Sequence, residues 1–498
     1  MKHDTLAAVD LGSNSFHLQI ARVVDDQIYL SDSLREPVRL GAGLTRDKRL
    51  DHATQLRALQ TLRRMGERLR GFPKGAVRAV GTNTLRVAKN AEPFLAEAEA
   101  VLGFPIEVVF GREEARLIYL GVAHSLPPAA DRRLVVDIGG GSSEFVVGTG
   151  LEPELVESIP IGCVSYSLKF FPEGRLEKAR FKKAHFAAAS ELERLVESYR
   201  QTGWTEAVGS SGTVKAVAAI LAAEQWTEHG ITAEGLERLR GAMVKCGDLG
   251  RLKLAGLRED RLPILAGGVA ILEAVFSQLG IERMEVSEGA LRHGVLYDLL
   301  GRTRHDDLRE ATVGHFQRRH HVDLAQSQRV WSLAETIGAD LGLMAEADFQ
   351  VLRWAAALHE IGISIAHAAY HKHSAYILSQ ADMPGFSQKD QRRLARIVLA
   401  HRGKLAKVEL QDLPAQSPEW SLIIALRLAA LFCRSRGHVP RPELRCRSTE
   451  TGFELALPEA WLEGHPLTEA ALEAEADEWG AVGLALEVLR LPDQQAGA

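Results

Sequence analysis

Two stretches of the sequence place an aspartate just before a glycine turn that carries hydroxyl or amide side chains. The first contains Asp10, Gly12, Ser13, Asn14 and Ser15, and the second contains Asp137, Gly139, Gly140, Gly141 and Ser142. Glycine lets backbone N–H groups converge on phosphate oxygens, and an aspartate at such a turn can hold Mg²⁺ directly or through water. One such turn is more often an ordinary β-turn, but two at a domain-sized spacing indicate phosphate chemistry.

Two further segments carry groups that suit a phosphate. A third glycine turn consists of Gly209, Ser210, Ser211, Gly212 and Thr213. It precedes a helical run over residues 214–223, whose first N–H groups would face an anion; an ordinary N-cap is the alternative. Arg86 follows a predicted strand over 76–80 and can clamp a phosphate, although an arginine taken alone is more often a surface residue.

Glu113 and Glu114 open a predicted helix directly after a strand over residues 106–110. Acids are favoured in the first helical turn by the helix dipole, which is the simpler explanation. A carboxylate aimed from a strand end into a cleft can also take a proton from an attacking water, as hydrolysis of a phosphoanhydride requires. The physics of two adjacent acids at a helix start does not separate them.

The elements that position these residues occur twice. Residues 6–16 and 134–145 both read as an apolar strand, an aspartate, a glycine turn and a second strand, which predicts a duplicated domain. The first copy adds strands over 27–31, 76–80 and 106–110 and helices over 51–69, 92–102 and 112–122. Alternating strands and helices predict α/β layers.

The remainder of the chain has a different character. Residues 308–432 show helical periodicity almost throughout, and the tail reads as strands over 444–448, 453–457 and 483–489 with a helix over 468–479. The sequence therefore predicts four domains, with bounds 1–126, 127–302, 303–437 and 438–498.

Composition excludes several classes of protein. The 498 residues are 25% charged and 46% hydrophobic with a net charge of -5, which argues against a general nucleic-acid binder. Four scattered cysteines without CxxC spacing exclude a disulfide scaffold. We expect no signal peptide and no membrane span. Basic residues gather at 391–407 and 434–447, either as solvated helix faces or as a track for a polyanion.

Taken in order, residues 9–17, 111–116, 137–144 and 209–213 resemble the motif series of the exopolyphosphatase / guanosine pentaphosphate phosphohydrolase family. The resemblance continues at 358–362 and 371–378. It implies two ribonuclease H-like domains of the actin-like ATPase superfamily with the active site between them, followed by an all-helical HD-like domain and a small α/β domain. It also implies a homodimer in the cytoplasm, with a peripheral position at the inner membrane face as an alternative.

The same resemblance assigns roles to residues. Glu114 is the catalytic base, and Asp137 and Glu144 organise metal and water. Asp10 joins them at the metal, Arg86 binds substrate, and the three glycine turns bind phosphate. The implied cofactor is Mg²⁺, with a monovalent cation such as K⁺ as a further candidate.

The implied activity is processive removal of terminal phosphates from inorganic polyphosphate. The three consecutive glycines after Asp137 and the segments 81–84 and 373–376 favour this substrate. The alternatives are 5′-phosphate hydrolysis of guanosine pentaphosphate (pppGpp), a non-catalytic regulator that binds polyphosphate or an alarmone, and a sugar kinase-like transferase. Intact Glu114, Asp137 and Glu144 argue against a binding protein, and no sugar site is evident.

His359 and Glu360 resemble the His-Asp pair of metal-dependent HD phosphohydrolases, with glutamate in place of aspartate. Gln326 stands where a further histidine ligand is expected. Two altered ligands disfavour a metal site, so we expect an HD-like scaffold that serves binding or dimerisation. His367, His371 and His373 have loose spacing and are expected to be loop histidines.

Overall fold

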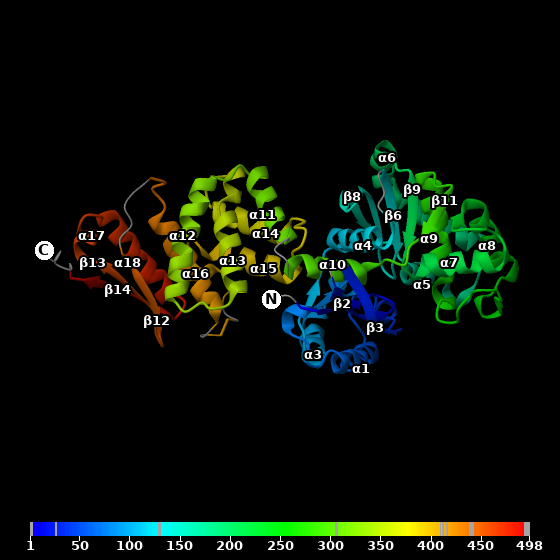
Figure 1. Cartoon of the computed structure of the whole chain (residues 1–498), viewed down its shortest axis with the longest axis horizontal. Helices are drawn as coiled ribbons and strands as arrows, with labels where there is room; N and C mark the ends of the chain where they lie inside the picture. Colours follow the sequence, from blue (N-terminus) through cyan, green and yellow to red (C-terminus); the bar gives the residue numbers. More distant parts are fainter. Residues whose placement is uncertain are drawn as a thin grey trace. The chain divides into compact units, whose positions relative to one another are not determined.

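The computed structural model describes residues 3–24, 27–127, 131–303, 307–408, 410, 413–414, 417–437 and 443–492. The chain divides into two compact units, Met1–Leu308 and Arg309–Ala498. The first unit holds both aspartate–glycine turns, and Figure 1 shows its two sheets in blue and in cyan to green. Each unit is described separately below.

The two sheets of the first unit repeat one arrangement. The first has the order β3-β2-β1-β4-β5 and the second β10-β11-β9-β6-β7-β8. The strands are β1 (Thr5–Leu11), β2 (Phe16–Val24), β3 (Gln27–Glu36), β4 (Val77–Gly81), β5 (Ile106–Val108), β6 (Arg132–Ile138), β7 (Ser143–Thr149), β8 (Glu152–Ile159), β9 (Glu206–Ser210), β10 (Ile231–Thr232) and β11 (Arg283–Val286). In both sheets the aspartate-bearing strand, β1 or β6, lies between an antiparallel and a parallel neighbour. The predicted duplication is confirmed.

The strand register decides which side chain lies beside each aspartate in the two sheets. Asp10 of β1 pairs with His17 of β2, whereas Asp137 of β6 pairs with Glu144 of β7. On its parallel side, Asp137 is in register with Ser210, at the start of the third glycine turn. Three of the predicted site residues therefore meet at one end of the second sheet because of strand register alone.

Ten helices are described in the first unit. They are α1 (His52–Arg68), α2 (Asn83–Val87), α3 (Ala91–Leu102), α4 (Gly111–Ser125), α5 (Cys163–Phe170), α6 (Lys178–Thr202), α7 (Ser211–Ala223), α8 (Ala233–Cys246), α9 (Leu265–Leu279) and α10 (Leu291–Thr303). The helices predicted over 51–69, 92–102 and 112–122 are α1, α3 and α4, and the strands predicted over 27–31, 76–80 and 106–110 are β3, β4 and β5.

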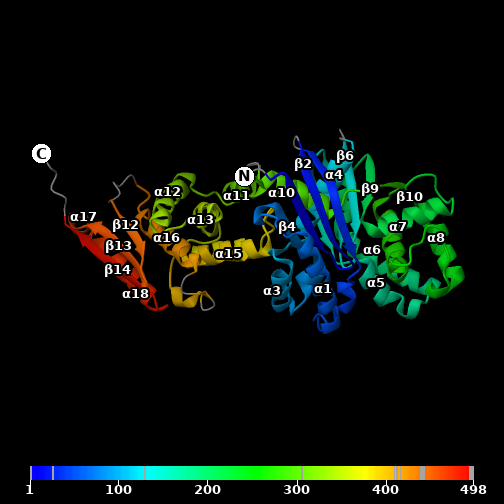
Figure 2. The same cartoon turned by 60° about the horizontal axis from the view of Figure 1, so that its bottom comes forward.

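Alternation along β1 explains how the helices cover the sheets. Ala7, Val9 and Leu11 enter one core with α1 and α3, whereas Leu6 and Ala8 enter another core with α4 and α10. The second core also takes side chains from the second sheet, so α4 and α10 lie between the two sheets. Figure 2 shows α1 and α3 together on the face of the first sheet that is opposite to α4 and α10.

One segment, Leu262–Leu279, is long and apolar enough to cross a membrane by length and composition alone. It contains α9, of which nearly every apolar side chain is buried among α5, α6 and α8. Because 72% of the segment is buried within the protein, we interpret it as a core helix.

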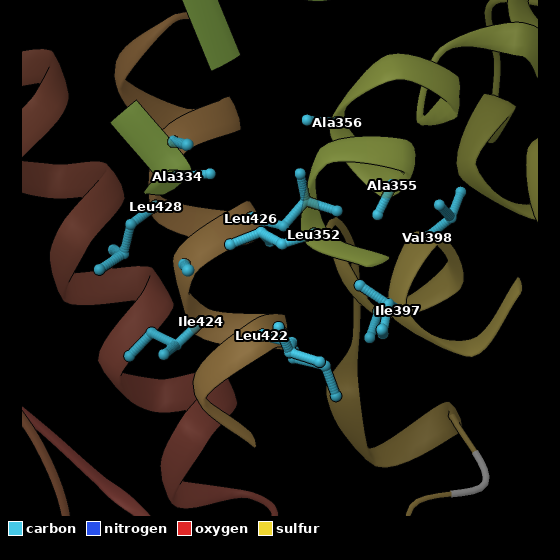
Figure 3. Packing of buried hydrophobic residues seen from close by; sticks show 14 of the residues in the cluster. Ala334, Leu352, Ala355, Ala356, Ile397, Val398, Leu422, Ile424, Leu426 and Leu428 are labelled. Carbon is cyan, nitrogen blue, oxygen red and sulfur yellow. The ribbon is translucent and has the colours of Figure 1, made fainter. Parts of the chain in front are cut away.

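The second unit contains helices followed by a three-stranded sheet of order β12-β13-β14. Its elements are α11 (Leu308–Arg319), α12 (Leu324–Asp340), α13 (Glu346–Leu358), α14 (Tyr370–Gln380), α15 (Gln388–Ala400), α16 (Pro418–Phe432), β12 (Arg445–Ser448), β13 (Gly452–Pro458), α17 (Glu459–Glu463), α18 (Pro466–Gly480) and β14 (Ala485–Leu491). One core runs from the helices into the sheet. Figure 3 shows part of this core, with Leu352 of α13 next to Leu426 of α16. The four predicted domain bounds stay a prediction.

Parts of the two basic stretches are neutralised within this unit. Arg393 pairs with Asp348 and Glu419, and Arg447 pairs with Glu454. Arg441 lies outside the described residues. Arg402 is exposed, and no carboxylate of the described residues forms an ion pair with it. A polyanion track here stays a prediction.

Candidate active site

A cavity of about 380 Å³ lies in the first unit and is lined by both of its halves. The predicted site residues that line it are Asp10, Gly12, Ser13, Asn14, Ser15, Glu114, Asp137, Gly139, Gly140, Gly141, Ser142, Ser211, Gly212 and Thr213. Arg86, Glu144, Gly209 and Ser210 are not among its lining residues. The fold therefore gathers most of the predicted residues around one space.

The first two glycine turns approach each other closely. A methyl group built on Gly140 would lie 2.9 Å from the Cβ atom of Ser13, and one built on Gly141 would lie 3.4 Å from the Ser13 hydroxyl. Ser13 accepts a hydrogen bond from the Thr84 hydroxyl at 2.7 Å, which fixes its side chain. Glycine is required at 140 because any larger residue would push the two turns apart.

This contact leads to a prediction for Gly140→Ala. We expect the added methyl group to displace the turns and lower kcat/KM by about 10- to 100-fold, because small misplacements of positioning groups are costly. The matched control is Gly241→Ala in α8, where no described atom outside the helix lies within 4 Å of the new methyl group. Steady-state kinetics and thermal melts of both variants test this; wild-type kinetics for Gly140→Ala would contradict it.

The third glycine turn has a buried part and a part that lines the cavity. Ser210 donates to the carbonyl oxygen of Gly289 at 2.9 Å and is fully buried, and Gly209 is also buried. The Ser211 hydroxyl accepts from the N–H groups of Thr213 and Val214 at 3.2 and 3.3 Å. The N-cap residue of α7 is Ser210, whose side chain forms no cap hydrogen bond, so the N-cap alternative is not borne out as stated, although the Ser211 hydroxyl accepts from N–H groups of the first turn. Ser211, Gly212 and Thr213 line the cavity.

The two adjacent glutamates at the start of α4 point to different surroundings. Arg116 binds both carboxylate oxygens of Glu113 at 2.8 Å and reaches Asp298 of α10. Glu113 thus belongs to an ion-pair network between helices. Glu114 lines the cavity, and Arg86 donates to its Oε2 at 2.8 Å. Of these two acids only Glu114 lines the cavity, and its role as catalytic base stays a prediction.

Arg86 has a different contact from the one expected. Its guanidinium group bridges Glu114 and the carbonyl oxygen of Val109, at 2.8 and 2.9 Å. In this structure it holds the carboxylate of Glu114 in place from behind the cavity lining. A direct contact between Arg86 and substrate stays a prediction.

Four carboxylates come together with little compensating charge. Burial raises the pKa of Asp137 to about 7, and the nearby carboxylates of Glu114 and Asp10 add to this rise. Burial, then the carboxylates of Glu114 and Asp137, raises the pKa of Glu144 well above its ordinary value. Burial also raises the pKa of Glu114, against the opposing charge of Arg86. Clustered carboxylates with raised pKa values are typical of sites that hold a cation or move protons.

The donors can be tested against Mg²⁺. Oδ1 of Asp10 is buried without a hydrogen-bond partner, while its Oδ2 lies 3.3 Å from Nδ1 of His17. Glu144 is held by the Ser158 hydroxyl at 2.9 Å. Within the described part of the chain, no three His, Cys, Asp or Glu side chains converge on one point. The donors fit Mg²⁺ held by one or two carboxylates and completed by phosphate oxygens and water, which is its usual coordination.

Sequence reasoning missed the cations of the cavity, which are Arg35, Lys215, Arg258, Arg261 and Arg292. They come from β3, α7, the loop before α9 and α10. Lys215 lies two residues after the third glycine turn, which is a signal that could have been used. The others lie outside any motif and are brought together only by the fold.

One of these cations joins the two halves of the unit. Nη2 of Arg35 in β3 lies 2.7 Å from Oδ2 of Asp260, which precedes α9 in the second half. Lys215 pairs with Glu288 at 2.8 Å. The lining of the cavity therefore carries both cations and the carboxylates Asp10, Glu114 and Asp137, and several of the cations are paired with acids. This combination suits an oligophosphate whose terminal group meets the carboxylates.

Two family models match the chain. The Ppx/GppA phosphatase family matches residues 19–303, and Ppx/GppA phosphatase, domain III, matches residues 308–476. A guanosine-5′-triphosphate,3′-diphosphate pyrophosphatase of Aeromonas hydrophila is 39% identical over 485 residues, which are 96% of this chain and 97% of that protein.

Solved structures agree with these matches. The crystal structure of an exopolyphosphatase from Cytophaga hutchinsonii is 26% identical with a TM-score of 0.54, over 59% of this chain and 97% of its own. An exopolyphosphatase-like protein at 23% identity, also with a TM-score of 0.54, covers 60% of this chain and 99% of its own, and shows the fold alone.

Proposed function

The chain belongs to the Ppx/GppA phosphatase family, whose members are phosphoanhydride hydrolases, and on that premise we propose that it removes the terminal 5′-phosphate of pppGpp. The observation that carries this proposal is the 39% identity to the Aeromonas guanosine-5′-triphosphate,3′-diphosphate pyrophosphatase along 96% of the chain. This identity favours pppGpp over inorganic polyphosphate as the substrate.

The reaction transfers the terminal phosphoryl group to water. The oxygen of a water molecule attacks the terminal phosphorus, the bond from that phosphorus to the bridging oxygen breaks, and the products are orthophosphate and the shortened nucleotide. Glu114 accepts the proton of the attacking water. A raised pKa makes this carboxylate a better base, and Arg86 fixes its direction through the 2.8 Å hydrogen bond.

The substrate is held by backbone and side-chain donors. The N–H groups of the two facing glycine turns bind oxygens of the terminal phosphates, and Lys215, Arg261 and Arg292 neutralise the others. A substrate with phosphate groups at both the 5′ and 3′ positions makes use of cations from several elements, as this cavity provides. Positioning and charge neutralisation are the main sources of rate acceleration in phosphoryl transfer.

Asp10, Asp137 and Glu144 are the candidates for holding Mg²⁺, with one or two of them binding it directly and the rest through water. When bound, Mg²⁺ neutralises charge on the terminal phosphate and helps to orient it. The unpartnered Oδ1 of Asp10 and the burial of Asp137, which raises its pKa, support this assignment, because a bound cation would compensate for both. A bound K⁺, a homodimer and a cytoplasmic location stay predictions.

Hydrolysis of inorganic polyphosphate is the second candidate. It is supported by the likeness to the Cytophaga exopolyphosphatase structure, which extends over 59% of this chain. The cations of the cavity suit a linear polyphosphate as well as a nucleotide.

Product analysis tests the proposal. The full chain is incubated with pppGpp and Mg²⁺, and the nucleotides are separated by anion-exchange chromatography. We expect one orthophosphate and one guanosine tetraphosphate for each substrate molecule consumed. Loss of the 3′ phosphates, or no turnover of the nucleotide alongside turnover of polyphosphate, would overturn it.

A further inference from the structure

A second cavity, of about 300 Å³, lies within the unit Arg309–Ala498. Its lining includes His359 at the end of α13, His401 at the end of α15, Arg402, and Arg434 just beyond α16. No step of the proposed reaction uses these residues. Their combination of buried imidazoles and arginines calls for a chemical explanation.

Both histidines have a defined tautomer. Nδ1 of His359 lies 2.8 Å from the carbonyl oxygen of Ala356, and Nδ1 of His401 is hydrogen-bonded to the carbonyl oxygen of Val398. A carbonyl oxygen only accepts, so each Nδ1 carries the proton and donates. Burial lowers the pKa of both rings, which keeps them neutral. Each Nε2 is therefore a hydrogen-bond acceptor.

The acceptor on His359 is unused. The side chain is 1% exposed, and no donor among the described residues reaches its Nε2. The nearby Oε1 of Glu360, at 4.0 Å, is another acceptor. In contrast, Nε2 of His401 lies 3.3 Å from the Tyr370 hydroxyl. Nε2 of His359 does not belong to the fully buried side-chain atoms that lack a partner, so it is open to the cavity and can accept from an O–H or N–H group of a ligand.

Two arginines of the cavity keep their charge available. Arg402 lies over the ring of Tyr370 at 5.3 Å, and Arg434 donates to the carbonyl oxygen of Leu467 at 2.8 Å. Neither forms an ion pair with a carboxylate in the described parts of the chain. A ring and a carbonyl group do not neutralise a guanidinium charge, so both arginines remain able to bind an anion.

The other charges of the cavity cancel in pairs. Arg427 binds Glu475 through two nitrogens, and Arg436 binds Glu360 with a separation of 2.6 Å. The cavity is consequently positive overall. This balance disfavours a metal ion, as does the absence, within the described residues, of any three converging His, Cys, Asp or Glu side chains.

Gln326, which stands where a further histidine ligand is expected in HD phosphohydrolases, forms hydrogen bonds within the protein. Nε2 of Gln326 donates to the carbonyl oxygen of Cys433 at 2.8 Å, and its Oε1 accepts from Arg329 at 2.9 Å. The arrangement therefore combines a free acceptor with free positive charge, and leaves no ligand set for a cation.

We propose that this cavity binds a phosphate group accompanied by an O–H donor, with Arg402 and Arg434 binding the anionic oxygens and Nε2 of His359 accepting from the O–H. Two sources share this chemistry. Hydrogenphosphate carries the O–H on the anion itself, and a small phosphate ester such as a pentose phosphate carries a neighbouring hydroxyl. A volume of about 300 Å³ accommodates either.

Equilibrium dialysis of the full chain tests the site at neutral pH with radiolabelled phosphate, sulfate and ribose 5-phosphate. The variant is Arg402→Gln, and the matched control is Lys404→Gln, an exposed cation that does not line the cavity. We expect a phosphate-binding component that the control retains and that weakens by about tenfold or more in Arg402→Gln, since bonds to charged groups contribute strongly. Binding at the catalytic cavity is common to both variants and cancels in the comparison.

Sulfate at neutral pH has no O–H and isolates the role of His359 without any mutation. We expect the binding component that depends on Arg402 to prefer phosphate over sulfate by about tenfold or more. The site supplies an acceptor for the O–H of the ligand, and such a site rejects an analogue that lacks this donor. Tighter binding of ribose 5-phosphate assigns the site to an ester, and tighter binding of phosphate assigns it to the free anion. Identical phosphate isotherms for Arg402→Gln and Lys404→Gln, or equal affinity for sulfate and phosphate, would overturn the proposal.

Discussion

Replacing Glu114 with glutamine is expected to lower kcat by about 10²–10⁴-fold, the usual loss when a general base is removed. Glutamine keeps the size of the side chain and a carbonyl oxygen that can still accept from Arg86, so the cavity should keep its shape. KM should change little, because the phosphate-binding turns are untouched. Single-turnover phosphate release, with substrate binding measured separately, distinguishes the two effects.

Glu113→Gln is the matched control, since it makes the same chemical change one residue earlier. It weakens the contacts between Glu113 and Arg116, and we expect a loss of about 1–3 kcal/mol in the free energy of unfolding with kcat nearly unchanged. If Glu113→Gln abolished turnover in the folded protein while Glu114→Gln retained it, the assignment of the base would be reversed.

Asp137→Asn is expected to abolish most of the activity and yet stabilise the free protein. The folded protein keeps a proton on Asp137 up to a pH of about 7, whereas the unfolded chain releases it near 3.8. The folded state thus binds more protons between these values, and its stability falls as the pH rises through them. Asparagine removes this loss, so the variant should gain most above pH 7 and little near pH 4.

Thermal melts at pH 5 and pH 8, with and without Mg²⁺, measure this effect. At pH 8 we expect Asp137→Asn to melt about 5 °C or more above the wild type, with a smaller difference at pH 5. Mg²⁺ should raise the melting temperature of the wild type more than that of the variant, because ligands that bind only the folded state stabilise it. The burial argument would be contradicted if the melting temperature of Asp137→Asn minus that of the wild type were lower at pH 8 than at pH 5.

The glycine turns could be predicted from the sequence because their chemistry is local. Asp10 and Asp137 each lie near the end of a strand that leads into glycines. The spacing of the two copies predicted the duplicated fold. The facing of the turns could not be predicted in the same way. The 2.9 Å approach of Gly140 to Ser13 depends on how the two halves pack around α4 and α10.

Residues that act through long-range packing escaped sequence reasoning. Arg35, Arg261 and Arg292 occupy no motif, and only the fold brings them to one cavity. The role of Glu113 was likewise hidden, because its partner Arg116 is local but Asp298 lies far along the chain. Arg86 was found by sequence, but its contact with Glu114 was not foreseen.

Internal competition tests the central claim most directly. The enzyme, with Mg²⁺, is given pppGpp and long-chain polyphosphate together, each with a distinct isotope in its terminal phosphate, and the two labels are counted in the released orthophosphate. The ratio of the labels, corrected for the concentration of chain ends, is the ratio of kcat/KM values. We predict that this ratio favours pppGpp, and that Glu114→Gln reduces both labels together. A ratio that favours polyphosphate would contradict the assignment of pppGpp as the substrate.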